Sequence, residues 1–200
     1  MLEEAHSRGY AVANFDRTEL APDMYNTDRD LGIYPLYPDC EFSAVSAWAW
    51  AYMRCVDALF MLEHIDTEHI AVSGHSRGGK AVLLAGALDE RITYTNPNCS
   101  GTHETELPYD MHFVKALIAP RYLLETGAYD DTWANPRGSY LTFTEAHRVY
   151  ELLGVPERAE SWYRTGGHRH QLPEFRALID FIERKRGHYV KNNDFVTVDP

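Results

Sequence analysis

The feature that most constrains the fold is a Gly-x-Ser-x-Gly pattern at residues 74–78, which lies between an apolar run and a helical segment. The apolar run over residues 70–72 is typical of a short buried strand, and an Ala-rich helix is predicted over residues 79–88. A serine at such a strand-to-helix junction sits on a sharp turn that strains its backbone and exposes its hydroxyl. The flanking glycines carry no side chain, so strand and helix can approach closely. The pattern therefore makes Ser76 a candidate nucleophile.

Strand and helix signals alternate along the chain. We predict strands over residues 10–15, 70–72, 92–95, 121–125 and 159–164. We predict helices that end at Gly9 or cover residues 42–62, 79–88, 109–117, 139–153 and 173–185. We predict irregular structure over residues 16–39, a loop over residues 96–107, and no clear period in the last fourteen residues. This alternation predicts an α/β fold, with a mostly parallel sheet that has helices on both faces. We expect one domain over residues 1–200, and because a helix end and a strand come first, we expect its first strands to be missing.

Composition narrows the partners. The chain has 200 residues, of which 44% are hydrophobic, enough for a core. The net charge of -11 disfavours nucleic acid and anionic membranes as partners, and no apolar run is long enough to cross a bilayer. Three scattered cysteines do not predict a disulfide framework. We expect a secreted or periplasmic protein if an export signal precedes residue 1, and a cytoplasmic one otherwise. The oligomeric state stays open.

The candidate partners of Ser76 each follow a predicted strand, where ligands gather in parallel sheets. Asp130 and Asp131 follow the strand over residues 121–125, and either carboxylate can orient a histidine; the other can cap a turn. His168, preceded by two glycines, is the preferred general base, with His170 in reserve. The order serine, acid, histidine is the one expected for this type of junction.

Two further features concern the reacting oxygen and metals. The backbone N–H of Arg77 is predicted to donate to an oxyanion, with a second donor from residues 16–19. The Arg77 side chain is another possible donor, or a surface arginine paired with an acid. A zinc ion needs at least three ligands. The histidines that could join such a set do not form a ligand-spaced cluster, so we predict no metal and no cofactor; they are His75, His103, His112, His168 and His170.

The motifs resemble one known family. Residues 74–80, Gly-His-Ser-Arg-Gly-Gly-Lys, resemble the Gly-Cys-Ser-Arg-x-Gly-Lys signature of the glucuronoyl esterases. Residues 131–136 resemble the Asp-x-Trp-Ala-Asp-Pro segment of bacterial members, and Gly167-His168 resembles their histidine site. The resemblance runs from about Gly9 to about Arg186. These enzymes are α/β-hydrolase-fold carbohydrate esterases, which cleave esters between the glucuronate of xylan and lignin alcohols.

The resemblance implies a role for each matching residue. It makes Ser76 the nucleophile and His168 the base, with no cofactor. It also implies that Arg77 helps to hold the oxyanion, and that Lys80 and Trp133 bind sugar hydroxyls; otherwise Lys80 is solvated and Trp133 is a packing anchor. Many relatives place the acid as a glutamate before Ser-Gly, where this chain has Cys99. A thiol cannot replace that carboxylate, so the acid is expected on the later loop, at Asp131 in preference to Asp130.

Two departures bear on the substrate. His75 stands where the family signature has cysteine, and residues 101–108 are shorter than the corresponding cap region, which predicts a more open pocket. From the resemblance, we expect a small-molecule or polysaccharide ester as substrate, foremost a 4-O-methyl-glucuronoyl ester. An acetyl-xylan esterase or a peptidase on the same scaffold is one alternative. An inactive carbohydrate-binding scaffold is the other.

Overall fold

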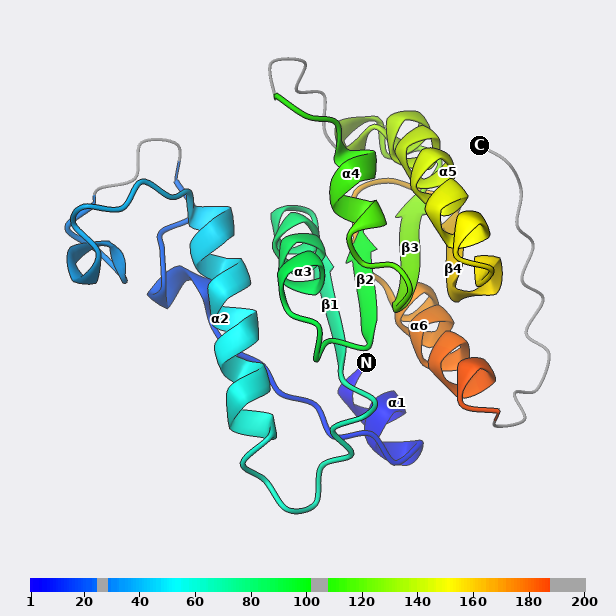
Figure 1. The fold of residues 1–200 in the computed structure, drawn as a ribbon, viewed down its shortest axis with the longest axis horizontal. Coiled ribbons are helices and arrows are strands. Elements are labelled where there is room, and N and C mark those ends of the chain that lie inside the picture. Colours follow the sequence, from blue (N-terminus) through cyan, green and yellow to red (C-terminus); the bar gives the residue numbers. More distant parts are fainter. Residues whose placement is uncertain (25–28, 102–107, 188–200) are drawn as a thin grey trace.

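The fold is an α/β arrangement built on one parallel sheet (Figure 1). The computed structural model describes residues 1–24, 29–101 and 108–187. The sheet has the strand order β1-β2-β3-β4, and all three pairings are parallel. The strands are β1 (Ala71–His75), β2 (Tyr94–Asn98), β3 (Tyr122–Ala128) and β4 (Ala159–Arg164). The predicted fold class is confirmed, and the strand predicted over residues 159–164 has the observed bounds.

Helices cover both faces of this sheet. They are α1 (Leu2–Ser7), α2 (Ala44–Leu59), α3 (Arg77–Leu88), α4 (Met111–Ala116), α5 (Pro136–Leu152) and α6 (Leu172–Lys185). Neighbouring residues of β3 point to opposite faces, as expected for a strand. Leu123 packs into a cluster with residues of α3 and α5, whereas Leu124 packs against Leu178 and Phe181 of α6. Figure 1 shows α3, α4 and α5 along one face and α6 on the other.

Local signals explain where the last two helices begin. Asn135 caps α5 by accepting a hydrogen bond from the Gly138 N–H at 3.0 Å, and a proline follows it at the first helical position. Gln171 and Glu174 form a reciprocal capping box at the start of α6. These caps determine where the loops after β3 and β4 end. Both loops carry candidate residues.

The second strand lies later in the chain than predicted. The sequence predicts a strand over residues 92–95 and a loop from Asn96, but β2 covers Tyr94–Asn98. Two buried asparagines, Asn96 and Asn98, therefore belong to the strand and not to the predicted loop. Their amides are satisfied within the sheet: the Asn96 Nδ2 donates to the Leu124 carbonyl at 2.7 Å, and the Asn98 Nδ2 donates to Thr126 Oγ1 at 2.9 Å. A backbone carbonyl and a side-chain hydroxyl of β3 thus compensate the burial of these polar groups.

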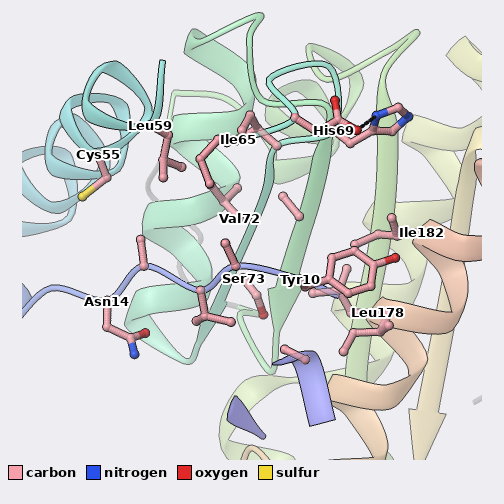
Figure 2. A pocket seen from close by; sticks show the side chains of 18 of the residues that line it. Tyr10, Asn14, Cys55, Leu59, Ile65, His69, Val72, Ser73, Leu178 and Ile182 are labelled. Atoms are coloured by element: carbon pink, nitrogen blue, oxygen red, sulfur yellow. Dashed lines mark hydrogen bonds and ion pairs between the residues drawn. The ribbon is translucent and has the colours of Figure 1, made fainter. Parts of the chain in front are cut away.

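The strand predicted over residues 10–15 is wrong. These residues form no strand, and a cavity of about 610 Å³ lies between them and β1. Figure 2 shows the segment, with Tyr10 and Asn14, running past Val72 and Ser73 of β1. A strand needs a neighbouring backbone at about 4.8 Å to pair its polar groups. Residues 10–15 pair with no strand of the sheet, so the apolar pattern alone does not produce a strand.

The other expectations agree with the structure within a few residues. A helix ends before Gly9, which has a φ of +82°, and the helix predicted over residues 42–62 is the shorter α2. Residues 16–39 are irregular where described, apart from the 3-10 helices Arg17–Glu19 and Tyr34–Leu36. Residues 25–28, residues 102–107 and the C-terminal segment from residue 188 lie outside the described residues.

The described residues contain no disulfide bond and no helix that could span a membrane. The three cysteines are free thiols. Within the described ranges, no helix has both the length and the apolar character needed to cross a membrane.

Candidate active site

Ser76 occupies a strained turn between β1 and α3. Its φ is +57° and its ψ is -123°, a backbone conformation that L-residues rarely adopt. The backbone N–H of Ser76 donates to the Asn98 carbonyl at 2.8 Å, which ties the turn to the end of β2. A Cβ on Gly74 would lie 2.4 Å from the Gly78 carbonyl oxygen, so the turn requires glycine there. The geometry agrees with the junction expected from the Gly-x-Ser-x-Gly pattern.

Ser76, His168 and Asp131 form one row of hydrogen bonds. The His168 Nδ1–H donates to Asp131 Oδ2 at 2.7 Å, and the Ser76 hydroxyl donates to His168 Nε2 at 2.9 Å. The carboxylate of Asp131 is only 2% exposed, and its Oδ1 also accepts the Ala134 N–H at 3.2 Å. Because a carboxylate only accepts, it keeps the proton on Nδ1 and leaves Nε2 as the acceptor that faces the serine.

The neighbouring aspartate makes a different contact. Asp130 Oδ2 accepts the backbone N–H of Gly166 at 2.7 Å, so it joins the loop after β3 to the loop after β4. Asp131, and not Asp130, is thus the aspartate that hydrogen-bonds to His168. The reserve histidine, His170, lies beside His75 at a ring-centroid distance of 5.9 Å, whereas the hydroxyl of Ser76 is bonded to His168. 

An arginine and a buried glutamate organise the loop that carries His168. The Arg164 Nε donates to Glu174 Oε1 at 2.5 Å, and Glu174 is fully buried. The same guanidinium donates to the carbonyls of Thr165 at 2.9 Å and Gly167 at 3.1 Å. Sequence reasoning missed this pair, although the capping-box glutamate at the start of α6 was a visible signal. The Arg169 carbonyl also accepts from this guanidinium, so three fixed carbonyls leave His168 little freedom to turn away from Ser76.

A second histidine flanks the ring of His168. The His75 Nδ1–H donates to Asn98 Oδ1 at 2.7 Å, and the centroids of the His75 and His168 rings lie 4.5 Å apart. Burial lowers the pKa of His75, and burial likewise lowers the pKa of His170. Both rings are therefore neutral near pH 7, so they add no positive charge beside His168.

The Arg77 side chain takes part in an ion-pair chain on the other side of Ser76. Arg77 pairs with Asp23 at 2.6 Å, and Asp23 also pairs with Arg17 at 2.8 Å. The Arg17 guanidinium lies 4.6 Å from the centroid of the Trp48 ring. Asp23 thus connects the segment over residues 16–19 to the turn at Ser76. The contribution of Arg77 to an oxyanion site stays a prediction.

The two residues predicted to bind sugar belong to elements that carry members of this row. Lys80 is half-buried on α3, one turn after Ser76. Trp133 belongs to the 3-10 helix Thr132–Ala134 after Asp131, and it is 78% exposed. An indole this exposed cannot anchor the packing of its loop. It remains available to a ligand, and sugar binding by both residues stays a prediction.

Metal-ligating atoms come together at two places among the described residues. Cys99, Asp131 and His168 have ligand atoms within 4.8 Å of one another, and so do Asp66, Glu68 and His69. The first set belongs to the hydrogen-bonded row, and the second is largely exposed. Of the other histidines considered for a metal, His112 lies 3.8 Å from Asp110 on the surface, and His103 lies outside the described residues.

Cys99, which follows β2, also has an unusual backbone near the row. Its φ is +46°, and its side chain is 6% exposed among Ala128 and Ala134. A left-handed conformation costs a residue with a Cβ about 1–2 kcal/mol.

The large cavity beside β1 is a separate feature, because Ser76, Asp131 and His168 do not line it.

A parallel sheet with a strained serine after β1, and with the acid and histidine on the loops after β3 and β4, defines the α/β-hydrolase fold. The family model described as "Glucuronyl esterase, fungi" matches residues 2–105 and 102–154. The chain belongs to this family, the glucuronoyl esterases.

Individual relatives support the assignment. The chain is 31% identical over 81% of its length to 4-O-methyl-glucuronoyl methylesterase 1 of Phanerochaete chrysosporium, and the match covers 44% of that protein. The chain thus spans about half the length of the curated relatives it matches. The structure superimposes on a carbohydrate esterase family 15 glucuronoyl esterase from Caldicellulosiruptor kristjansonii with a TM-score of 0.85 and 29% identity, covering 98% of this chain and 68% of that one. A glucuronoyl esterase from Solibacter usitatus gives a TM-score of 0.80 and 27% identity, covering 90% and 60%.

Proposed function

We propose that the protein is a serine esterase that hydrolyses 4-O-methyl-glucuronoyl esters through an acyl-enzyme. The observation that carries the proposal is the hydrogen-bonded row of Ser76, His168 and Asp131, at 2.9 and 2.7 Å, in a chain of the glucuronoyl esterase family. The geometry supplies what ester hydrolysis needs: a half-buried serine hydroxyl, an acceptor nitrogen facing it, and a carboxylate behind the ring.

In this mechanism, Ser76 Oγ attacks the ester carbonyl while His168 Nε2 removes its proton. The resulting imidazolium is stabilised by the buried carboxylate of Asp131, which stays ionised. The oxyanion forms near the backbone N–H of Arg77, the first residue of α3, where the helix dipole also favours negative charge. His168 then gives its proton to the leaving alcohol, and it activates the water that releases the acid from Ser76.

The proposed substrate class follows from the family and from two side chains near the row. The half-buried Lys80 is a cation on the helix that starts at the serine. The exposed ring of Trp133 offers an apolar face to a sugar, on the same short segment as Asp131. We propose that the uronate moiety lies between them, with its ester carbonyl at Ser76.

Hydrolysis of methyl and benzyl glucuronate esters by the protein and its Ser76→Ala variant tests the proposal. We expect turnover that falls by about 10⁴-fold or more in the variant, because the nucleophile is lost. Ser73→Ala is the matched control. Ser73 lies on the same strand, but it hydrogen-bonds to Asn96 Oδ1 at 2.9 Å and lines the cavity instead of the row. This control should keep most of the activity.

A fluorophosphonate probe separates the chemistry from the substrate. Labelling at Ser76 without turnover of either glucuronate ester would retain the serine mechanism and overturn the uronate substrate, so acetyl and peptide substrates would be assayed next. A folded protein that is not labelled at Ser76 would contradict the serine mechanism itself, and tight glucuronate binding by it would indicate a carbohydrate-binding scaffold.

A further inference from the structure

The buried carboxylate of Asp131 has a third polar neighbour besides His168 and the Ala134 N–H. The sulfur of Cys99, an oxygen of Asp131 and a ring nitrogen of His168 all lie within 4.8 Å of one another. The Cys99 sulfur thus lies beside the Asp131 carboxylate, and this carboxylate contributes to raising the pKa of the thiol. Asp131 and Cys99 are both buried, with exposures of 2% and 6%. Little water can therefore replace this contact.

The backbone aims the thiol at the carboxylate. β2 ends at Asn98, whose carbonyl accepts the Ser76 N–H at 2.8 Å, and the Cys99 N–H donates to the Thr126 carbonyl at 3.0 Å. These bonds tie the residue between β1 and β3 and hold its left-handed backbone at a φ of +46°. The side chain of Cys99 then enters a small apolar cluster with Ala128, the last residue of β3, and Ala134, on the loop that carries Asp131.

The thiol is a proton donor and not a thiolate. Burial, and then the neighbouring Asp131 carboxylate, raise the pKa of Cys99 to about 12. An ionised sulfur would place a second negative charge beside the carboxylate in a buried site. At the pH of any assay, Cys99 therefore carries a hydrogen that it can donate, and it adds no charge to the row.

We propose that Cys99 is a positioning residue for the acid: its S–H donates to the Asp131 carboxylate and holds that group in the orientation that His168 requires. This inference rests on the proposed function of Asp131. With the S–H of Cys99 as a third donor beside His168 and the Ala134 N–H, the carboxylate cannot rotate without losing one of these contacts. Cys99 touches no reacting atom and acts only through Asp131.

Steady-state kinetics of Cys99→Ala and Cys99→Ser on a methyl glucuronate ester, measured from pH 5 to 9, test the inference. Alanine removes the donor, whereas serine keeps one in a smaller side chain. We expect kcat of Cys99→Ala to fall by about fivefold with little change in KM, because a single hydrogen bond to a charged group is lost. We expect the acid limb of its kcat/KM profile to move to higher pH, because a carboxylate with fewer donors stabilises the imidazolium more strongly. Cys99→Ser should restore both quantities to within about twofold of the original protein.

The control is Cys55→Ala, which removes a half-buried thiol on α2 that lines the cavity beside β1. It should leave kcat and the pH profile unchanged. Unchanged kinetics in Cys99→Ala would overturn the proposal. So would equal losses in the alanine and serine variants, which would indicate a packing role. The rate of fluorophosphonate labelling at Ser76 provides the same comparison without a substrate, so a wrong substrate assignment and a wrong role for Cys99 are distinguishable.

Discussion

The carboxyl end of β1 and its lateral edge have different surroundings. The first is packed with hydrogen-bonded side chains, and the second borders a cavity. At the carboxyl end of the strands, each polar side-chain atom of Ser76, His168 and Asp131 has a hydrogen-bond partner within 3.2 Å. Along the lateral edge, β1 faces a cavity of about 610 Å³ instead of another strand. The comparison shows that this chain builds its chemical site from loops that are supported on several sides. The lateral edge contributes no residue to that row.

The largest expected effect lies at the carboxyl end of the strands. Asp131→Asn should lower kcat/KM by about 10⁴-fold, because an amide no longer holds the proton on His168 Nδ1 and cannot stabilise the imidazolium. Asp130→Asn is the matched control, since it changes the adjacent residue, whose carboxylate only accepts the Gly166 N–H. We expect that control to lose less than about tenfold. Steady-state kinetics of both variants measure the difference, and equal losses would show that the two aspartates share the role.

The next effect concerns the turn that presents Ser76. Gly74→Ala would bring a Cβ to 2.4 Å from the backbone oxygen of Gly78, so we expect the free energy of unfolding to fall by about 3 kcal/mol. Gly167→Ala, in the loop before His168, meets no atom within 4 Å and should change stability by less than about 0.5 kcal/mol. Urea unfolding of both variants tests this. A Gly74→Ala protein as stable as Gly167→Ala would mean that the turn relaxes.

The third effect compares the same truncation at a fully packed position and at a position beside the cavity. Val82 of α3 is fully buried, and Val72 of β1, in the same cluster, borders the cavity. We expect Val82→Ala to lower the free energy of unfolding by about 2 kcal/mol, and Val72→Ala by about 1 kcal/mol, because a side chain beside an existing void has fewer contacts to lose. Denaturant unfolding gives both values. A larger loss for Val72→Ala would indicate that the lateral edge is packed in solution.

The smallest expected effect is a pH dependence of stability. Burial lowers the pKa of His75 and His170 below 6.5 in the folded protein. The unfolded chain therefore binds more protons as the pH falls through 6.5, so the free energy of unfolding decreases in that range and is restored above it. Melting temperatures between pH 7.5 and 5.5 should fall with pH, and His170→Asn should weaken the slope. His6→Asn, an exposed histidine of α1, is the control. An unchanged slope in His170→Asn would assign the pH dependence to other groups.

Much of the candidate site could be predicted because its signals are local. The Gly-x-Ser-x-Gly pattern needs only a strand before it and a helix after it, and parallel strands bring their carboxyl ends to one edge. Ser76, His168 and the Asp130-Asp131 pair were therefore recognisable from order and spacing, and the structure brings three of these four into one row. The residues that hold the row were missed. Asn98 acts through His75, which lies 23 positions away in the sequence, and Arg164 acts on backbone carbonyls of its own loop, which no residue pattern reveals.

The α/β class, the order of its elements and the strained turn at Ser76 could be predicted from the chain alone, because these depend on side-chain periodicity and on glycines within a few residues. Which aspartate meets His168 depends on the folded molecule, since adjacent residues in a loop point in different directions. Only the folded molecule also shows that residues 10–15 form no strand and that Asn96 and Asn98 belong to β2. A strand exists only where a neighbouring backbone accepts its hydrogen bonds, and no local pattern carries that information.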